Sequence, residues 1–177
     1  MEERKGAATY KGQPVTLMGH EVKVGQRAPD FKTVGIDMQE VTLSQSKGKI
    51  RLLSVVHSLD TPVCDLQTKL FEKEARKYPN VATYTISMDL PFSQARYGSE
   101  HNIRNLKTLS DYKEASFGMA YGLLIKETRL LSRAVFIVDA DDMIRYVEYV
   151  KEITESPNYD MAIEALKTIV GECTREG

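Results

Sequence analysis

The stretch of residues 51–88 constrains the fold most strongly, because it sets two apolar runs on either side of an amphipathic segment. The first run, RLLSVV at 51–56, is too short and too rich in β-branched residues for a helix, which predicts a buried strand. Residues 62–78 carry apolar side chains at three- and four-residue spacing, which predicts a helix. VATYTISM at 81–88 predicts a second strand. The stretch therefore predicts a strand–helix–strand unit with parallel strands and a right-handed crossover.

The segments after this unit complete a recognisable order. A short helix is expected at 91–101, followed by a loop that contains LKTLSD. Two β-prone runs, at 133–138 and 143–150, are joined by turn residues and are expected to pair antiparallel. A last helix is predicted at 158–170, with Gly171 as its C-cap. This order is that of an α/β thioredoxin-like fold, in which helices flank both faces of a mixed central sheet.

The N-terminal part of the chain is predicted to stand apart from that sheet. Residues 1–8 are polar, and we expect them to form a flexible tail. Short β-prone pieces alternate with glycines at 9–24, which predicts an N-terminal β-hairpin. No linker, repeat or low-complexity tract divides the chain, so residues 1–177 are expected to form a single domain.

Composition argues against several classes of function. The chain has 24 Lys and Arg against 25 Asp and Glu, a net charge of −1, so it lacks the basic patch expected of a nucleic-acid-binding protein. The charged N-terminus is followed by no apolar segment, which argues against a signal peptide or membrane span and predicts a cytoplasmic protein. The two cysteines and the scattered histidines fit no metal spacing, and no glycine-rich nucleotide loop is present. We therefore expect no metal and no cofactor.

Cys64 is the candidate reactive residue. Pro62 suits the first position of the predicted helix and Thr61 its N-cap, so Cys64 falls in the first turn. The free backbone N–H groups and the positive end of the helix dipole favour a thiolate there, which is the nucleophilic form. An inert packing role is the alternative for an unpaired cysteine. Arg133 opens the run at 133–138, where an arginine is usually solvated or paired at the surface.

The segments SLDTPVC, SMDLPFSQARY and RLLSRAVFIVDADD resemble the bacterial thiol peroxidase family, a branch of the peroxiredoxins. The resemblance extends from about residue 10 to residue 166. It implies a thioredoxin fold with an N-terminal hairpin, a homodimer, and an antioxidant oxidoreductase that reduces hydrogen peroxide or alkyl hydroperoxides. By the same resemblance Cys64 is the peroxidatic cysteine, Thr61 holds the peroxide, and Arg133 stabilises the thiolate and the developing charge, with thioredoxin as reductant.

The sequence departs from the family pattern at two positions. His57 replaces the proline of the family motif, and it is expected to be either a tolerated replacement or a modifier of the active site, as a cation or as a neutral base. Gly98 stands where the family has its resolving cysteine. Cys173 is the only other thiol, and as a resolving residue it is the less favoured alternative. We therefore expect a one-cysteine peroxidase whose sulfenic acid at Cys64 is resolved by an external thiol, either thioredoxin or a small molecule. The alternative is a redox sensor or a regulatory homologue of low activity.

Overall fold

A seven-stranded mixed sheet forms the centre of the molecule, in a computed structural model that describes residues 2–176. The predicted parallel pair lies in its middle and is extended by a parallel strand on one side and an antiparallel hairpin on the other. The order across the sheet is β10 (Ile144–Tyr149), β9 (Ala134–Val138), β5 (Arg51–Val55), β6 (Ala82–Ser87), β7 (Lys107–Ser110), β3 (Lys32–Val34) and β4 (Glu40–Thr42). The mixed, thioredoxin-like sheet predicted from the sequence is confirmed.

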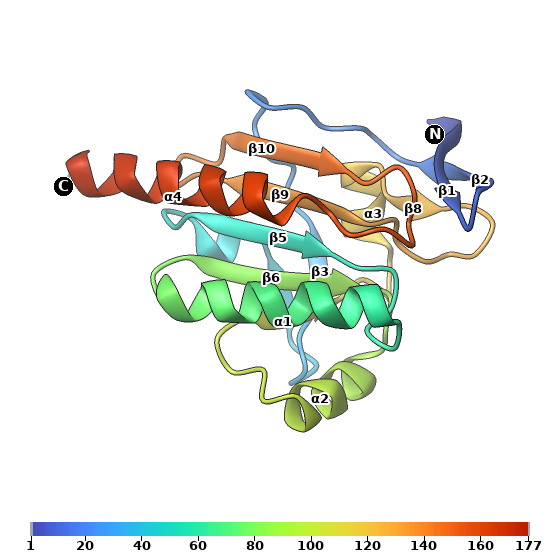
Figure 1. The fold of residues 1–177 in the computed structure, drawn as a ribbon, viewed down its shortest axis with the longest axis horizontal. Coiled ribbons are helices and arrows are strands. Elements are labelled where there is room, and N and C mark those ends of the chain that lie inside the picture. Colours follow the sequence, from blue (N-terminus) through green and yellow to red (C-terminus); the bar gives the residue numbers. More distant parts are fainter. Residues whose placement is uncertain (1, 177) are drawn as a thin grey trace.

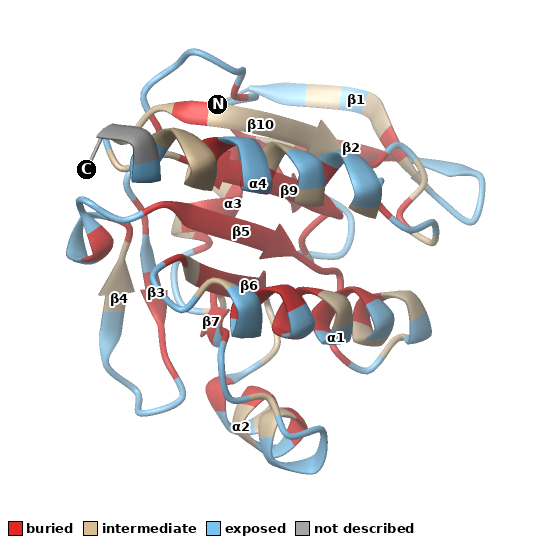
Figure 2. Cartoon of the chain, turned by 60° about the vertical axis from the view of Figure 1, so that its left-hand side comes forward, coloured by how far each residue is buried: buried red, intermediate tan, exposed pale blue. Residues whose placement is uncertain are grey.

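Helices cover both faces of this sheet (Figure 1). Helices α1 (Pro62–Lys77) and α4 (Tyr159–Glu176) lie on one face, where Leu52 of β5 packs against Phe71 and Leu166. Helix α3 (Ser116–Tyr121) packs on the other face, which receives Leu53 of β5. This alternation along β5 is the two-residue period of a strand buried on both sides. Figure 2 shows β5 buried along its length, while the helices expose their outer faces.

The remaining elements are short. Helix α2 (Pro91–Glu100) follows β6 as predicted, and a 3₁₀ helix spans Ser44–Ser46. The segment LKTLSD was expected to be a loop, which was wrong because Lys107–Ser110 pairs with β6 as β7. A strand of four residues is too short to show a clear period, so tertiary pairing decides its structure. Within the described part of the chain, none of the helices combines the length and apolarity needed to cross a membrane.

The N-terminal hairpin lies earlier in the chain than predicted. Strand β1 (Glu3–Tyr10) pairs antiparallel with β2 (Gln13–Met18), and β8 (Leu124–Ile125) joins as a third strand. The expected flexible tail at 1–8 was therefore wrong from Glu3 onward, and the hairpin does not extend to residue 24. Ala8 is fully buried against β2, β8 and the loop around Ile153. The charged residues of β1 obscure its strand pattern in the sequence, and few of its positions are buried.

The C-terminal helix also differs from its prediction. Gly171 was expected to end this helix, whereas α4 continues through it to Glu176. Gly171 does not have the positive φ of a C-cap glycine. A glycine within a helix costs only about 1 kcal/mol relative to alanine, so one residue does not stop it.

Glu152 fastens the hairpin turn to the body of the molecule. Its carboxylate accepts hydrogen bonds from the Gly12 N–H at 2.7 Å, the Thr9 hydroxyl at 3.0 Å and the Thr154 hydroxyl at 2.7 Å. The Thr154 N–H and hydroxyl and the Gly12 N–H lower the pKa of Glu152 to about 2. As the pH falls, Glu152 takes up a proton at its ordinary pKa of 4.5 in the unfolded chain, but only near 2 in the folded protein. The ionised carboxylate therefore stabilises the fold above pH 4.5, and this stabilisation is lost as the pH falls through about 2.

We predict that Glu152→Gln lowers the thermal unfolding midpoint at neutral pH, because the amide accepts fewer of these hydrogen bonds. The difference in unfolding midpoint between this variant and the unmodified protein should shrink as the pH falls from 4.5 toward 2. Thermal unfolding followed by circular dichroism measures both effects, and Glu155→Gln is the control at an exposed neighbour. A deficit that is the same at all pH values would contradict the role of the ionised carboxylate.

Candidate active site

Cys64 lies in the first turn of α1, directly beyond the carboxyl end of β5. Pro62 begins the helix and Thr61 is its N-cap residue, as the sequence predicts. The Cys64 side chain is fully buried and packs with Val56, Leu59 and Tyr97. The thiol is therefore shielded from solvent by the loop before α1 and by Tyr97 of α2.

Thr61 does not cap the helix with its side chain. Its hydroxyl donates a hydrogen bond of 2.9 Å to the backbone carbonyl of Ser58, and no side-chain cap is present. The carboxylate of Asp89, which follows β6, holds the same loop by accepting from the Ser58 hydroxyl at 3.0 Å and the Leu59 N–H at 2.9 Å. The loop before Cys64 is thereby fixed to the neighbouring strand, with the Thr61 hydroxyl half-buried at its end.

Arg133 is a buried charge with defined partners, contrary to the usual surface position of an arginine at a strand end. Its side chain is 2% exposed. Nε donates to the Ile153 carbonyl at 2.9 Å, and Nη1 donates to Oε1 of Gln67 at 2.9 Å. The Gln67 side chain is itself held by its Nε2, which donates to the Ser54 hydroxyl at 2.8 Å. The guanidinium is therefore oriented from α1, β5 and the loop before α4.

Gln67 links Arg133 to the helix that carries Cys64. It accepts from Nη1 of Arg133 and lies three residues after Cys64 on α1, within one turn of the helix. Tyr159, at the start of α4, packs edge-on against Phe71 of α1 with 5.9 Å between the ring centres. Burial raises the pKa of Tyr159.

His57 follows β5 closely and is buried against the N-terminal hairpin. It is 9% exposed, and its ring stacks on Tyr10 of the hairpin with 5.3 Å between the ring centres. Burial, and secondarily the charge of Arg133, lowers the pKa of His57. Nδ1 lies 3.2 Å from the Leu131 carbonyl, which only accepts, so Nδ1 carries the proton. The hydrogen bond to Leu131 by itself raises the pKa of His57, so burial and the charge of Arg133 are what disfavour the cationic alternative.

A latch between two helices covers Cys64. The Tyr97 hydroxyl on α2 donates a hydrogen bond of 2.6 Å to the carboxylate of Asp65, the residue after Cys64. Burial and this hydrogen bond raise the pKa of Tyr97. Gly98, the next residue, faces Ile103 and has room for a side chain, since an added Cβ would lie 3.9 Å from the Ile103 Cβ.

Cys173 is remote from this site. It is exposed near the end of α4, fourteen residues after Tyr159. At a rise of 1.5 Å per residue, that places it about 21 Å along the helix from Tyr159. A disulfide needs Cα atoms less than about 7 Å apart, so Cys64 and Cys173 of one chain do not meet in this conformation.

A small open cavity lies beside Thr61, and neither Cys64 nor Arg133 belongs to its lining. It has a volume of about 390 Å³ and is lined by Thr61, Pro62 and Asp65 of the α1 segment and by Arg96, Tyr97 and His101 of the α2 segment, among others. The described residues contain no group of three or more His, Cys, Asp or Glu side chains placed to hold a metal ion.

Comparison with known proteins identifies the family. The model of the Redoxin family matches residues 23–163. The thiol peroxidase of Halalkalibacterium halodurans is 53% identical over 159 residues, which cover 90% of this chain and 96% of that protein. The thiol peroxidase of Bacillus subtilis is 51% identical over 162 residues, which cover 92% and 97%. The chain belongs to the thiol peroxidase family of redoxins.

Solved structures agree with this assignment. A peroxiredoxin-like protein from Aquifex aeolicus superimposes with a TM-score of 0.87 at 39% identity, covering 96% of this chain and 99% of that one. The fold is also that of the thiol peroxidase from Chromobacterium violaceum, with a TM-score of 0.81 at 22% identity and coverage of 96% and 98%. The family resemblance and the peroxiredoxin fold expected from the sequence are confirmed.

The sequence did not single out Gln67, Asp89 or Tyr97. Gln67 lies three residues after Cys64, on the same side of the helix, but a polar residue there is usually solvent-exposed. Asp89 and Tyr97 both belong to the segment SMDLPFSQARY that carried the resemblance. The resemblance of that segment could have pointed to both residues, but their contacts are known only from the fold.

We predict that Gln67→Met slows peroxide reduction roughly tenfold, because Arg133 loses the acceptor that orients it; a lost buried hydrogen-bond partner costs about 1–3 kcal/mol. Gln67→Glu keeps an acceptor for Nη1 and should restore most of the rate. Stopped-flow oxidation of the reduced protein by peroxide measures both variants. If the Met variant folds normally and reacts at the original rate, Gln67 has no positioning role.

Proposed function

We propose that this thiol peroxidase reduces hydrogen peroxide and alkyl hydroperoxides through a sulfenic acid at Cys64, which an external thiol then resolves. The observation that carries this proposal is a buried cysteine in the first turn of a helix, with a guanidinium held by Gln67 one turn further along, while Cys173 is exposed near the end of α4. The names of the relatives, all thiol peroxidases, support the reaction class.

The proposed reaction begins with attack of the Cys64 thiolate on one peroxide oxygen. The O–O bond breaks, the sulfur is oxidised to sulfenic acid, and the other oxygen leaves as water or an alcohol after taking a proton. An external thiol then attacks the sulfenic sulfur and releases water. A second thiol reduces the mixed disulfide and regenerates Cys64, so two thiols are consumed for each peroxide.

The neighbouring groups have complementary roles in this proposal. Nε and Nη1 of Arg133 are engaged by Ile153 and Gln67, which leaves Nη2 to donate to the thiolate and to the developing charge on the leaving oxygen. The Thr61 hydroxyl exchanges its bond to Ser58 for one to the peroxide. His57, neutral and stacked on Tyr10, shields the site as a replacement for the family's proline.

A redox sensor is the second candidate function. Complete burial of Cys64 and the glycine at position 98 favour it, because both would slow regeneration. Steady-state peroxide consumption with thioredoxin, glutathione or dithiothreitol as separate reductants distinguishes the two. Continued turnover with one of them supports the peroxidase, whereas a single stoichiometric burst with all three supports the sensor.

The expected homodimer, the thioredoxin partner and the cytoplasmic location remain predictions. Leu90 and Phe92 at the start of α2 are 49% and 69% exposed, and they offer apolar surface for a second copy. Light scattering at micromolar concentration tests the dimer.

We predict that Arg133→Met slows peroxide reduction about a hundredfold, because the thiolate and the leaving oxygen lose a charged donor. The second-order rate constant for oxidation of Cys64 measures this effect. Arg129→Met, at an exposed arginine near the same strand, is the control and should react normally. Equal rates for the two variants would remove Arg133 from the mechanism.

We predict that Gly98→Cys forms an intrachain disulfide with Cys64 on addition of one equivalent of peroxide. The position has space for the side chain, and opening of the Tyr97–Asp65 latch lets α2 bring the new sulfur to Cys64. Non-reducing mass spectrometry detects the bond, with Gly98→Ser as a control of matched size. Absence of the disulfide despite complete oxidation of Cys64 would show that α2 does not open.

A further inference from the structure

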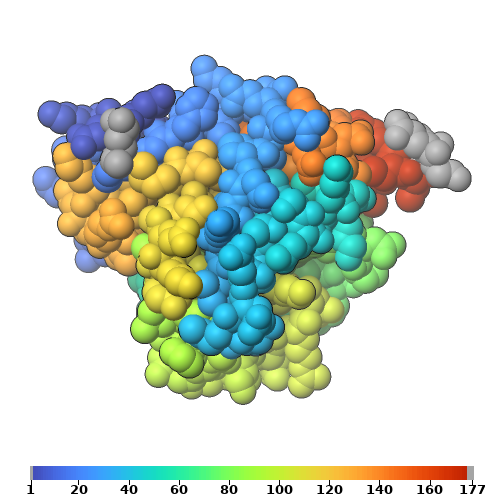
Figure 3. All heavy atoms as spheres, turned by 180° about the vertical axis from the view of Figure 1, so that it is seen from behind, coloured from blue at the N-terminus to red at the C-terminus, as the bar shows by residue number. Residues whose placement is uncertain are grey.

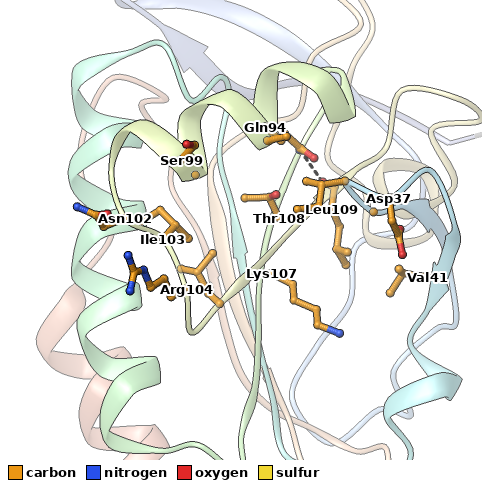
Figure 4. A pocket seen from close by; sticks show the side chains of 15 residues that line it. Asp37, Val41, Gln94, Ser99, Asn102, Ile103, Arg104, Lys107, Thr108 and Leu109 are labelled. Atoms are coloured by element: carbon orange, nitrogen blue, oxygen red, sulfur yellow. Dashed lines mark hydrogen bonds between the residues drawn. The ribbon is translucent and has the colours of Figure 1, made fainter.

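A second cavity, larger than the one beside Thr61, lies on the other side of α2. Its volume is about 770 Å³, within the range of sites that bind small molecules. It lies between α2, the loop that leads into β7, and the turn that joins β3 to β4 (Figure 4). Figure 3 shows this side of the molecule, where the β3–β4 segment lies above the residues around α2. Its apolar lining includes Val41, Ala95, Ile103, Leu106 and Leu109.

The walls of this cavity are tied together. Gln94 on α2 is 1% exposed, and its Nε2 donates to the Leu109 carbonyl at 2.9 Å and to the Ser87 hydroxyl at 3.0 Å. These bonds join α2 to β7 and β6, so the cavity is a preformed feature of the fold. Its lining contains none of Thr61, Cys64 and Arg133. The cavity is therefore distinct from the proposed peroxide site.

The charges around the cavity favour one kind of ligand. Arg104 and Lys107 line it with exposed side chains, and neither appears in an ion pair among the residues that the structure describes. Figure 4 shows their charged ends pointing to opposite sides, so a single anionic group meets only one of them. Asp37, across the cavity, is the one acidic side chain of the lining. The lining thus carries one net positive charge next to an apolar interior. A ligand with a single anionic group and a hydrocarbon body matches both properties.

We propose that this cavity binds a medium-chain carboxylate, with its hydrocarbon chain against Ile103, Leu106 and Leu109 and its carboxylate toward Lys107. Gly98 lines the cavity, and a larger side chain there would occupy part of its space next to Ile103. The glycine that removes the family's resolving thiol also keeps this cavity open. Binding here needs no chemistry at Cys64 and goes beyond the proposed peroxidase function.

Isothermal titration of the reduced full-length chain with decanoate tests the proposal. Binding at one site per chain is expected, with decanol at least tenfold weaker because it lacks the charge. Gly98→Leu fills part of the cavity and should weaken decanoate binding at least tenfold. A leucine has higher helix propensity than a glycine, so this variant should keep its thermal stability.

The charge requirement is tested by a double variant. Arg104→Gln with Lys107→Gln should weaken decanoate binding at least tenfold, while Lys73→Gln, at an exposed lysine of α1, should leave it unchanged. Absence of decanoate binding, or equal binding by the unmodified protein, the Gly98→Leu variant and the double variant, would overturn the proposal. Peroxidase turnover is measured in a separate assay, so failure of the binding proposal is distinguished from failure of the proposed function.

Discussion

The buried guanidinium of Arg133 is the interaction on which the rest of the site depends. Removing such a charge from water costs several kcal/mol unless its donors are paired. Here Gln67 and the Ile153 carbonyl each take one donor, and Gln67 is fixed in turn by Ser54 of the central strand. The buried charge is therefore stable only when three elements are packed together, namely α1, β5 and the segment before α4. The same packing brings a positive charge to Gln67, one turn after Cys64 on the same helix.

Burial controls access to Cys64. The thiol is fully buried, and the Tyr97–Asp65 hydrogen bond holds α2 against the segment that carries it. In the proposed reaction a thiol reductant is bulkier than a peroxide. Regeneration is therefore the step of that proposal that we expect burial to slow most.

The sequence predicted those parts of the fold whose hydrophobic pattern is periodic. The unit from β5 through α1 to β6 follows from its apolar spacing, and the proline at the start of α1 placed Cys64 in the first turn. Strand β1 was missed because Glu3, Arg4 and Lys5 hide the buried Ala8 in a polar stretch. Gln67 was missed because its neighbours in space come from distant segments. The roles of Thr61, Arg133 and His57 came from the resemblance, while their hydrogen bonds and burial required the fold.

Mass spectrometry of the unmodified chain after one equivalent of peroxide tests the central claim most directly. The account predicts one added oxygen on Cys64, trapped as a sulfenic acid adduct, with Cys173 unchanged and no disulfide within or between chains. Cys173→Ser should give the same product at the same rate. A stoichiometric disulfide between Cys64 and Cys173, or oxidation confined to Cys173, would contradict a one-cysteine peroxidase centred on Cys64.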